Sequence, residues 1–357
     1  MVALRWRSCQ LSRYGGRRRS CAGAYGSAAV GCPYSSCGRV ASVRRVRRVK
    51  LRTTLDRLVA AASLPPVAEA EPLPGLGLDN QLLLATLVNG QQVLLRQGSA
   101  SVAPAPRARF LELHQVGAPR LWAADDTGAV LVDFVAGETM AAAAERGAVT
   151  DEVWRRLGQA YAKVHRVRFP RPLTGTFGPQ ELQLAPDDPV DSLLTTVDSG
   201  EPWVARHRPR LAGHLEQLRS RIKQRSDEVR AEIPCLSHGD PNWHNVVVGD
   251  GSVTLIDWDF PAVRYPLDEL AGVEEHAYLH GFTELPAAFF AGYGREVSRT
   301  LLRLYRIASC LRMLSSPDWA GMLVDEAMPA GQLAMIRRFY QGWSNWFDDL
   351  PRHLSHT

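Results

Sequence analysis

Cysteine is scarce in most of this 357-residue chain, and long apolar runs are absent. Only Cys235 and Cys310 lie beyond residue 52, which excludes a disulfide-rich secreted fold and fits a reducing compartment, so we predict a cytoplasmic protein. No stretch approaches the ~20 uninterrupted apolar residues of a membrane helix, which argues against a membrane protein and a membrane partner. Apolar residues make up 45% and charged residues 22%, as in an ordinary globular protein.

Acidic residues are missing from the first 52 positions, which hold 13 of the 42 Lys and Arg residues. The rest of the chain therefore carries 29 basic and 37 acidic side chains, a net charge of −8. Because the basic excess is confined to residues 1–52, we expect no nucleic-acid partner for the fold. This segment lacks helical or strand periodicity, and we interpret it as a disordered extension or as sequence ahead of a later start near Val49. A basic arm that binds RNA or a membrane is the alternative.

The next segment, residues 53–135, contains a strong hairpin signal. Apolar runs over 81–88 and 92–96 flank Asn89-Gly90, a pair favoured in tight β-turns. A short amphipathic helix over 55–62 and a breaker-rich linker over 65–74 come before the hairpin. A helix over 107–116 and strands over 120–123 and 129–134 come after it. This order predicts a small, mostly antiparallel β lobe with one helix beside the sheet.

Helical periodicity dominates residues 136–357. Thr150 is a candidate N-cap, and Val153, Leu157, Tyr161 and Val164 then recur at helical spacing. Further helices are predicted over 211–222, 287–314 and 332–349. A single hairpin interrupts them, with strands over 246–248 and 253–256 around a Gly-Asp-Gly-Ser turn. The fold class is therefore α+β, with a small β lobe and a larger, mostly helical lobe.

One segment of the helical lobe carries the strongest chemical signal. His238-Gly239-Asp240 is followed five residues after Asp240 by Asn245, and the hairpin then delivers Asp257. Because Asn245 precedes the first hairpin strand and Asp257 ends the second, both lie at the same end of the hairpin. An amide oxygen and a carboxylate are hard ligands suited to Mg²⁺, and Asp240 could accept a proton from an attacking hydroxyl.

This arrangement resembles the aminoglycoside phosphotransferase and choline kinase superfamily, whose signature is H-G-D-x-x-x-x-N followed by a hairpin and a D-W-[DE] element. The resemblance covers about residues 75–310. It implies a two-lobed protein-kinase-like fold that binds ATP and Mg²⁺ in a cleft, with the nucleotide on the β lobe. It further implies that Asp240 is the catalytic base, that Asn245 and Asp257 bind Mg²⁺, and that His238 orders the loop.

Lysine is also scarce, which limits the residues that could bind the phosphates of ATP. The chain has three lysines, Lys50, Lys163 and Lys223, so none lies on the expected third strand. Arg96 ends the second hairpin strand, where such folds place the cation that holds phosphates; a solvated strand-end arginine is the alternative. A helix glutamate usually pairs with this cation. Glu112 is the candidate, although the register places the superfamily's glutamate nearer Pro106.

Two further segments are expected to contact the nucleotide. Gly75-Leu76-Gly77-Leu78-Asp79-Asn80 precedes the hairpin and resembles the superfamily's nucleotide loop, so Gly77 and Asn80 are candidate phosphate-binding residues. Residues 131–137 fall where the lobes join. The resemblance implies that the Asp133 carbonyl and the Val135 amide meet the adenine edge, and the alternative is a plain buried strand end.

The predicted function is ATP- and Mg²⁺-dependent phosphorylation of a hydroxyl on a small molecule. An aminoglycoside-like antibiotic is the first choice of acceptor, and a metabolic alcohol such as choline or a sugar is the second. Asp268, Glu274 and Glu275 lead toward the acceptor side in relatives, and we expect them to favour a cationic acceptor. A degenerate kinase fold that only binds ligands stays open. A metallohydrolase built on His238 and His244 is the rival reading.

Overall fold

The computed structural model of this chain describes residues 50–73, 81–98, 104–178, 181–325 and 328–357. The expected N-terminal extension up to residue 49 lies outside the described residues. So do Gly77 and Asn80 of the expected nucleotide loop, which stay predictions. No helix in the described ranges is long and apolar enough to cross a membrane.

The described chain begins with a helix over residues 50–61 and an antiparallel sheet whose strand order is β1-β2-β3-β5-β4. The elements of this β lobe are β1 (Val67–Leu73), β2 (Gln81–Leu87), β3 (Gln92–Gln97), α2 (Pro104–Leu113), β4 (Leu121–Ala124) and β5 (Ala129–Asp133). Asn89-Gly90 forms the expected turn between β2 and β3, and Gly90 has a positive φ of 84°. The expected linker over 65–74 is wrong in part, because β1 pairs along β2 as an edge strand.

The helix over residues 50–61 covers one face of this sheet. Its buried side chains Leu55, Leu58 and Val59 belong to one hydrophobic cluster with inward-facing residues of β2, β3 and β5, such as Leu95 and Leu131. Leu51 packs against the same cluster, so the β lobe begins before residue 53, the boundary expected from the sequence. Burial of this apolar stripe supplies the main stabilisation of the small lobe.

The larger lobe is mostly helical. Its helices are α3 (Met140–Glu145), α4 (Asp151–His165), α5 (Pro189–His207), α6 (Ala212–Gln224), α7 (Ser226–Ala231), α8 (Pro266–Leu279), α9 (Ala287–Tyr293), α10 (Arg299–Ser315), α11 (Pro317–Leu323), α12 (Ala330–Asp348) and α13 (Leu350–Ser355). The single helix expected over 287–314 is divided into α9 and α10. Gly294, with a φ of 69°, ends α9 in a left-handed cap.

Two small sheets carry the loops of this lobe. One has the order β11-β10-β6 and comprises β6 (Glu138–Thr139), β10 (Val246–Gly249) and β11 (Ser252–Leu255). The other has the order β8-β7-β12-β9 and comprises β7 (Leu173–Phe177), β8 (Leu182–Pro186), β9 (Cys235–Ser237) and β12 (Ala262–Arg264). The predicted hairpin is therefore present, with Val246 opposite Leu255.

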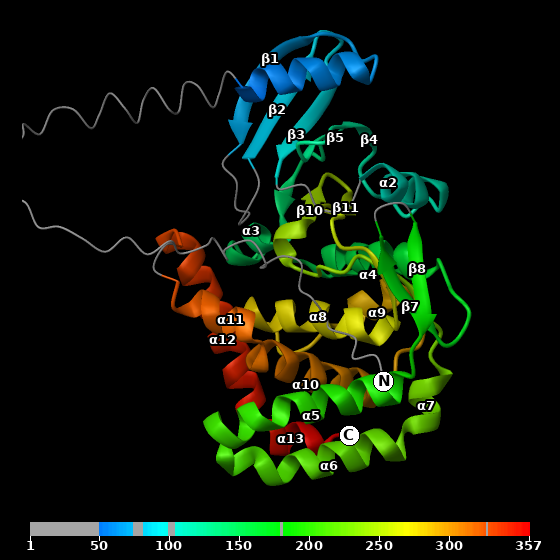
Figure 1. The fold of residues 1–357 in the computed structure, drawn as a ribbon, viewed down its shortest axis with the longest axis vertical. Helices are drawn as coiled ribbons and strands as arrows, with labels where there is room; N and C mark the ends of the chain where they lie inside the picture. The colour runs from blue at the N-terminus through cyan, green and yellow to red at the C-terminus, as the bar shows by residue number, and fades with distance from the viewer. Residues whose placement is uncertain (1–49, 74–80, 99–103, 179–180, 326–327) are drawn as a thin grey trace, which may run out of the picture. The chain divides into compact units, whose positions relative to one another are not determined.

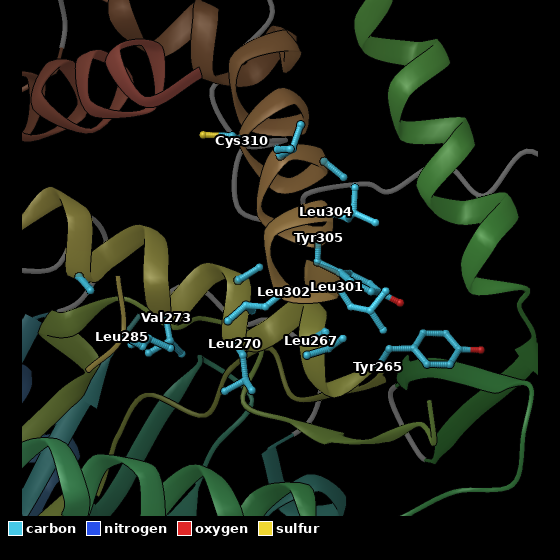
Figure 2. Close-up of a cluster of buried hydrophobic side chains, with 14 of the residues drawn as sticks. Tyr265, Leu267, Leu270, Val273, Leu285, Leu301, Leu302, Leu304, Tyr305 and Cys310 are labelled. Atoms are coloured by element: carbon cyan, nitrogen blue, oxygen red, sulfur yellow. The ribbon is translucent and has the colours of Figure 1, made fainter. Parts of the chain in front are cut away.

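The core of the larger lobe forms around α8 and α10, which lie alongside each other (Figure 1). Figure 2 shows Leu267 and Leu270 of α8 close to Leu301 and Leu302 of α10, with Val273 of α8 beside Leu285, all of them buried. α8 is therefore a rigid central helix, and side chains on it can fix loops that pass over its N-terminal half.

Gly137 sits at the junction of the two lobes. It has a φ of +142°, and a Cβ there would lie 2.4 Å from the carbonyl oxygen of Val248. Only glycine fits this conformation and this close approach. Directly after it, β6 pairs with β10 through Thr139 and Val247, so the chain leaving the β lobe is hydrogen-bonded to the hairpin of β10 and β11.

Candidate active site

The H-G-D-x-x-x-x-N segment forms a loop between β9 and β10. Gly239 has a φ of +83°, and a Cβ there would lie 1.9 Å from the carbonyl oxygen of Phe260. The loop therefore turns tightly against the segment that carries Asp257. A short 3-10 helix, Trp243–Asn245, brings Asn245 to the start of β10, and Trp243 is fully buried beneath it.

A buried carboxylate on α8 holds this loop. Glu269 accepts hydrogen bonds from the Ser237 hydroxyl (2.8 Å) and the Gly239 amide (2.9 Å). Its other oxygen lies 2.8 Å from His165 Nε2, and His165 Nδ1 contacts the Tyr293 hydroxyl at 2.8 Å. Burial opposes ionisation, yet the bond and charge of His165 keep the pKa of Glu269 below its usual value. The sequence does not single out Glu269, because its partners lie on other elements far away along the chain.

His238 ties the same loop to the second hairpin strand. Its Nδ1 lies 3.0 Å from the Asp240 carbonyl and its Nε2 lies 2.8 Å from the Ile256 carbonyl. The ring packs edge-on against Trp258 with centroids 4.5 Å apart. These contacts suit the expected loop-ordering role. They also oppose the metallohydrolase reading, because both ring nitrogens are engaged by backbone oxygens.

Asp240, Asn245 and Asp257 converge at the end of the hairpin. Asp240 accepts a hydrogen bond from the Asn242 amide (3.3 Å) and one from the Asn245 side chain. Burial raises the pKa of Asp240. Asp257 adopts a φ of 61°, rare for a non-glycine residue, where its strand has ended. Its pKa is raised by burial and, beyond that, by Asp259 and Asp240, although Arg96 opposes the shift.

This donor set fits Mg²⁺. Asn245 donates to Asp240 through its amide nitrogen, which leaves its amide oxygen available as a ligand. Asp257 adds a carboxylate, and a divalent cation would stabilise the charged forms of Asp240 and Asp257, which burial disfavours. The three residues singled out by the sequence are therefore brought together.

Arg96 of β3 reaches the same place from the other lobe. Its Nη1 binds the Asp257 carboxylate and its Nη2 binds the Asp259 carboxylate. Burial works against the charge of Arg96, but the two carboxylates raise its pKa. The alternative of a solvated strand-end arginine does not hold, since the guanidinium is largely buried between two acids.

The expected pairing of Glu112 with Arg96 is wrong. Glu112 is exposed, and Arg96 pairs instead with Asp257 and Asp259. The residue of α2 that faces the site is Arg107, which binds Asp259. Glu112 lies five positions after Arg107 on the helix, a rotation of about 140° beyond a full turn, so the two side chains leave on different faces.

Asp133 ends β5 at the approach to Gly137. Its carboxylate accepts hydrogen bonds from Trp122 Nε1 (2.7 Å) and the Arg120 amide (3.2 Å). The carboxylate of Asp133 is thus engaged by hydrogen bonds within the β lobe. The adenine contacts expected of the Asp133 carbonyl and the Val135 amide stay a prediction.

The three acids assigned to the acceptor side are drawn into the interior of the helical lobe, and their contact with an acceptor stays a prediction. Asp268 contacts Arg264 and Arg312 at 3.4 and 3.3 Å. Glu274 is buried against Arg306 (2.9 Å) and accepts the Leu285 amide (3.2 Å). Glu275 is buried, and burial raises its pKa to about 7. Arginines of α10 pair with Asp268 and Glu274, and Glu275 has no such ion pair among the described residues, so none of the three is a free surface charge as expected.

A protein-family model described as "Phosphotransferase enzyme family" matches residues 69–308. No curated protein sequence matches the chain.

Solved structures of similar fold come from two groups of kinases. A choline/ethanolamine kinase family protein from Mesorhizobium loti has 17% identity and a TM-score of 0.54, covering 81% of this chain and 92% of that one. An ethanolamine kinase of Plasmodium vivax has 13% identity and a TM-score of 0.52, covering 81% and 84%. A thermostable mutant of aminoglycoside phosphotransferase APH(4)-Ia with AMP-PNP and hygromycin B has 17% identity and a TM-score of 0.52, covering 76% and 94%. These likenesses confirm the protein-kinase-like fold expected from the sequence.

Proposed function

The chain belongs to the phosphotransferase enzyme family, and from this premise we propose that it transfers the γ-phosphoryl group of ATP to a hydroxyl of a small molecule. The observation that carries the proposal is the convergence of Asp240, Asn245 and Asp257 at one end of the hairpin, with Arg96 facing them from the β lobe. That set contains a proton acceptor, two oxygen ligands for Mg²⁺ and a cation for phosphate, which are the parts phosphoryl transfer needs.

Each residue has a defined task in this reaction. Asp240 orients the acceptor hydroxyl and takes its proton as the oxygen bonds to the γ-phosphorus, while the bond from that phosphorus to the β–γ bridging oxygen breaks and ADP leaves. Asn245 and Asp257 would hold Mg²⁺, which neutralises charge on the phosphates when bound. Arg96 binds phosphate oxygens from the opposite side. Glu269 and His238 keep the loop in place, so that catalysis is mainly positioning and electrostatics.

For the acceptor we propose an aminoglycoside-like antibiotic first, and choline, ethanolamine, a sugar or another metabolic alcohol as the alternative. The structure with hygromycin B supports the first choice, and the choline/ethanolamine kinase family protein supports the second. Because Asp268, Glu274 and Glu275 are engaged inside the lobe, the preference for a cationic acceptor loses the residues on which it was based.

The test is ADP release from Mg·ATP across a panel of aminoglycosides, choline, ethanolamine and sugars, with Asp240→Asn as the inactive control. We expect at least one acceptor to stimulate ADP release by wild type and none to stimulate it in the variant. Nucleotide binding without turnover on any acceptor would point to a binding module and contradict the proposal. Equal turnover by wild type and Asp240→Asn would also contradict it.

A further inference from the structure

α2 brings a positive charge to the position where the superfamily resemblance places a negative one. Arg107 donates from Nη1 to the Asp259 carbonyl (2.8 Å) and from Nη2 to Asp259 Oδ1 (3.2 Å). Its side chain is 8% exposed. The only acid on this helix, Glu112, points elsewhere and is exposed. The helix therefore lacks an acidic partner for Arg96.

Asp259 takes that place from another part of the chain. Its Oδ1 accepts from both Arg96 and Arg107, so two arginines from different elements meet on one oxygen. The second edge of the Arg96 guanidinium binds Asp257. The result is a row of alternating charges, Arg107, Asp259, Arg96 and Asp257, that runs from the helix to the expected metal ligand.

The two ends of this row differ in accessibility. The Asp257 side chain is 33% exposed, compared with 18% for Asp259. Asp259 is also held through its backbone carbonyl, whereas Arg96 is the only basic side chain paired with Asp257 among the described residues. Asp257 is therefore the partner that a ligand can replace, and Asp259 is the fixed one.

We propose that Asp259 and Arg107 are positioning residues that replace the helix glutamate as the support for Arg96. Arg107 fixes Asp259, Asp259 keeps one edge of the Arg96 guanidinium, and the other edge can exchange Asp257 for a phosphate oxygen. Without Asp259, both edges would turn to Asp257, and a bidentate pair would then occupy the carboxylate that Mg²⁺ needs. The inference rests on the proposed function, because it assumes that Arg96 and Asp257 meet a nucleotide and its metal.

The experiment measures the affinity for Mg·ADP by calorimetry, together with the melting temperature, for Asp259→Asn, Arg107→Met and the double variant. Arg107→Met keeps much of the buried stem and removes the charge. We expect Asp259→Asn to weaken binding by about tenfold, the loss typical of one charge-assisted hydrogen bond, and Arg107→Met by somewhat less. Since Arg107 acts through Asp259, the double variant should bind no more weakly than Asp259→Asn alone.

Two further variants separate positioning from folding. Asp259→Glu keeps the charge and should retain affinity within about threefold, even if the melting temperature falls, because a charged partner for Arg96 remains. Glu112→Gln, on the exposed face of the same helix, should change neither quantity.

Several results would overturn the inference. One is an unchanged affinity in Asp259→Asn while wild type binds Mg·ADP. Others are losses that multiply in the double variant, or Glu112→Gln being as damaging as Arg107→Met. A lowered melting temperature with unchanged affinity in both Asp259→Asn and Arg107→Met would reduce the pair to a structural role. A wild-type chain that binds no nucleotide would contradict the proposed function itself, and the inference with it.

Discussion

The two sides of the site are supported in different ways. On the helical lobe, the catalytic loop is held by Glu269, a fully buried carboxylate whose partners all belong to that lobe. On the β lobe, Arg96 is held by ion pairs that cross to the helical lobe and remain partly exposed. Buried, fully paired networks specify one geometry, whereas the ion pair of Arg96 with the more exposed Asp257 is the easier one to rearrange.

The difference suits the chemistry proposed for each side. The base must stand in a fixed position relative to the transferred phosphoryl group, since small misplacements of a catalytic group are expensive. The phosphate-binding cation must exchange its partners each time nucleotide and metal enter. Substitutions on the helical side should therefore affect turnover and stability, and those around Arg96 should affect nucleotide binding.

The largest effect is expected at Asp240, on the fixed side. Asp240→Asn should lower turnover by about 10²–10⁴-fold, the usual contribution of a positioned general base, while Mg·ADP affinity stays near wild type. Steady-state rates and calorimetry on the same preparations measure the two quantities. Turnover within about tenfold of wild type would remove Asp240 from the role of base.

Glu269→Gln removes the buried carboxylate that holds the loop between β9 and β10. The neutral amide can no longer serve as an anionic acceptor for the Gly239 amide, the Ser237 hydroxyl and His165 together, and we expect a loss of about 3 kcal/mol in unfolding free energy. Because the pKa of Glu269 is depressed, its contribution is present above its unfolded pKa and is lost as pH falls through the folded value.

Denaturant unfolding of Glu269→Gln against Glu112→Gln supplies the measurement and its matched control. If both variants unfold at the same denaturant concentration, the Glu269 carboxylate does not stabilise the loop between β9 and β10. The fixed geometry of that loop would then need another explanation.

Glu275 lies on the same helix as Glu269 but is poorly satisfied, with Oε1 buried and unpartnered. Its pKa of about 7 in the fold exceeds the ordinary value of 4.5, so the folded state retains a proton that the unfolded chain has released. This group therefore makes stability fall as pH rises between those two values. Glu275→Gln should remove the effect, and its advantage over wild type should grow by about 2 kcal/mol from about pH 5 to about pH 8.

The pH series must compare variant with wild type, because other groups titrate in the same range. Burial lowers the pKa of His276 to about 3 and that of His280 to about 4, which makes stability rise with pH over part of this interval. These contributions cancel in the difference between the two proteins. A difference that does not change with pH would mean that Glu275 is ionised in the fold.

The sequence predicted the residues of the H-G-D-x-x-x-x-N loop and the hairpin. It did not predict the residues that hold Arg96 in place opposite them. Asp240, Asn245 and Asp257 were found because one short segment and one hairpin contain them all. Arg107 and Asp259 lie 152 residues apart and meet only in the folded chain. A signal existed, since α2 has a basic residue beside the position expected for a glutamate and D-W-D offers a second acid.

The pairing of Asp268 and Glu274 was not predictable for a related reason. Along residues 257–275, Arg264 is the only basic residue. The arginines that neutralise Asp268 and Glu274, Arg312 and Arg306, come from α10, more than 30 positions later. Local charge predicts a surface field only when no other element packs on the same face.

The smallest effect, and the one that most directly tests the exchangeable side, is expected for Asp257→Asn. Removing an anionic ligand should weaken Mg·ADP binding by about tenfold, the scale of one charge-assisted contact. With a chelator in place of Mg²⁺, we expect the loss of affinity in Asp257→Asn to disappear or to become a gain. Asp257 then acts only as a competitor of phosphate for Arg96, so its neutralisation leaves ADP affinity equal to or above wild type. Arg96→Ala is the matched control and should weaken binding in both conditions. If Asp257→Asn weakens ADP binding equally with and without Mg²⁺, Asp257 and Arg96 do not exchange partners, and the contrast between a fixed and an exchangeable side fails.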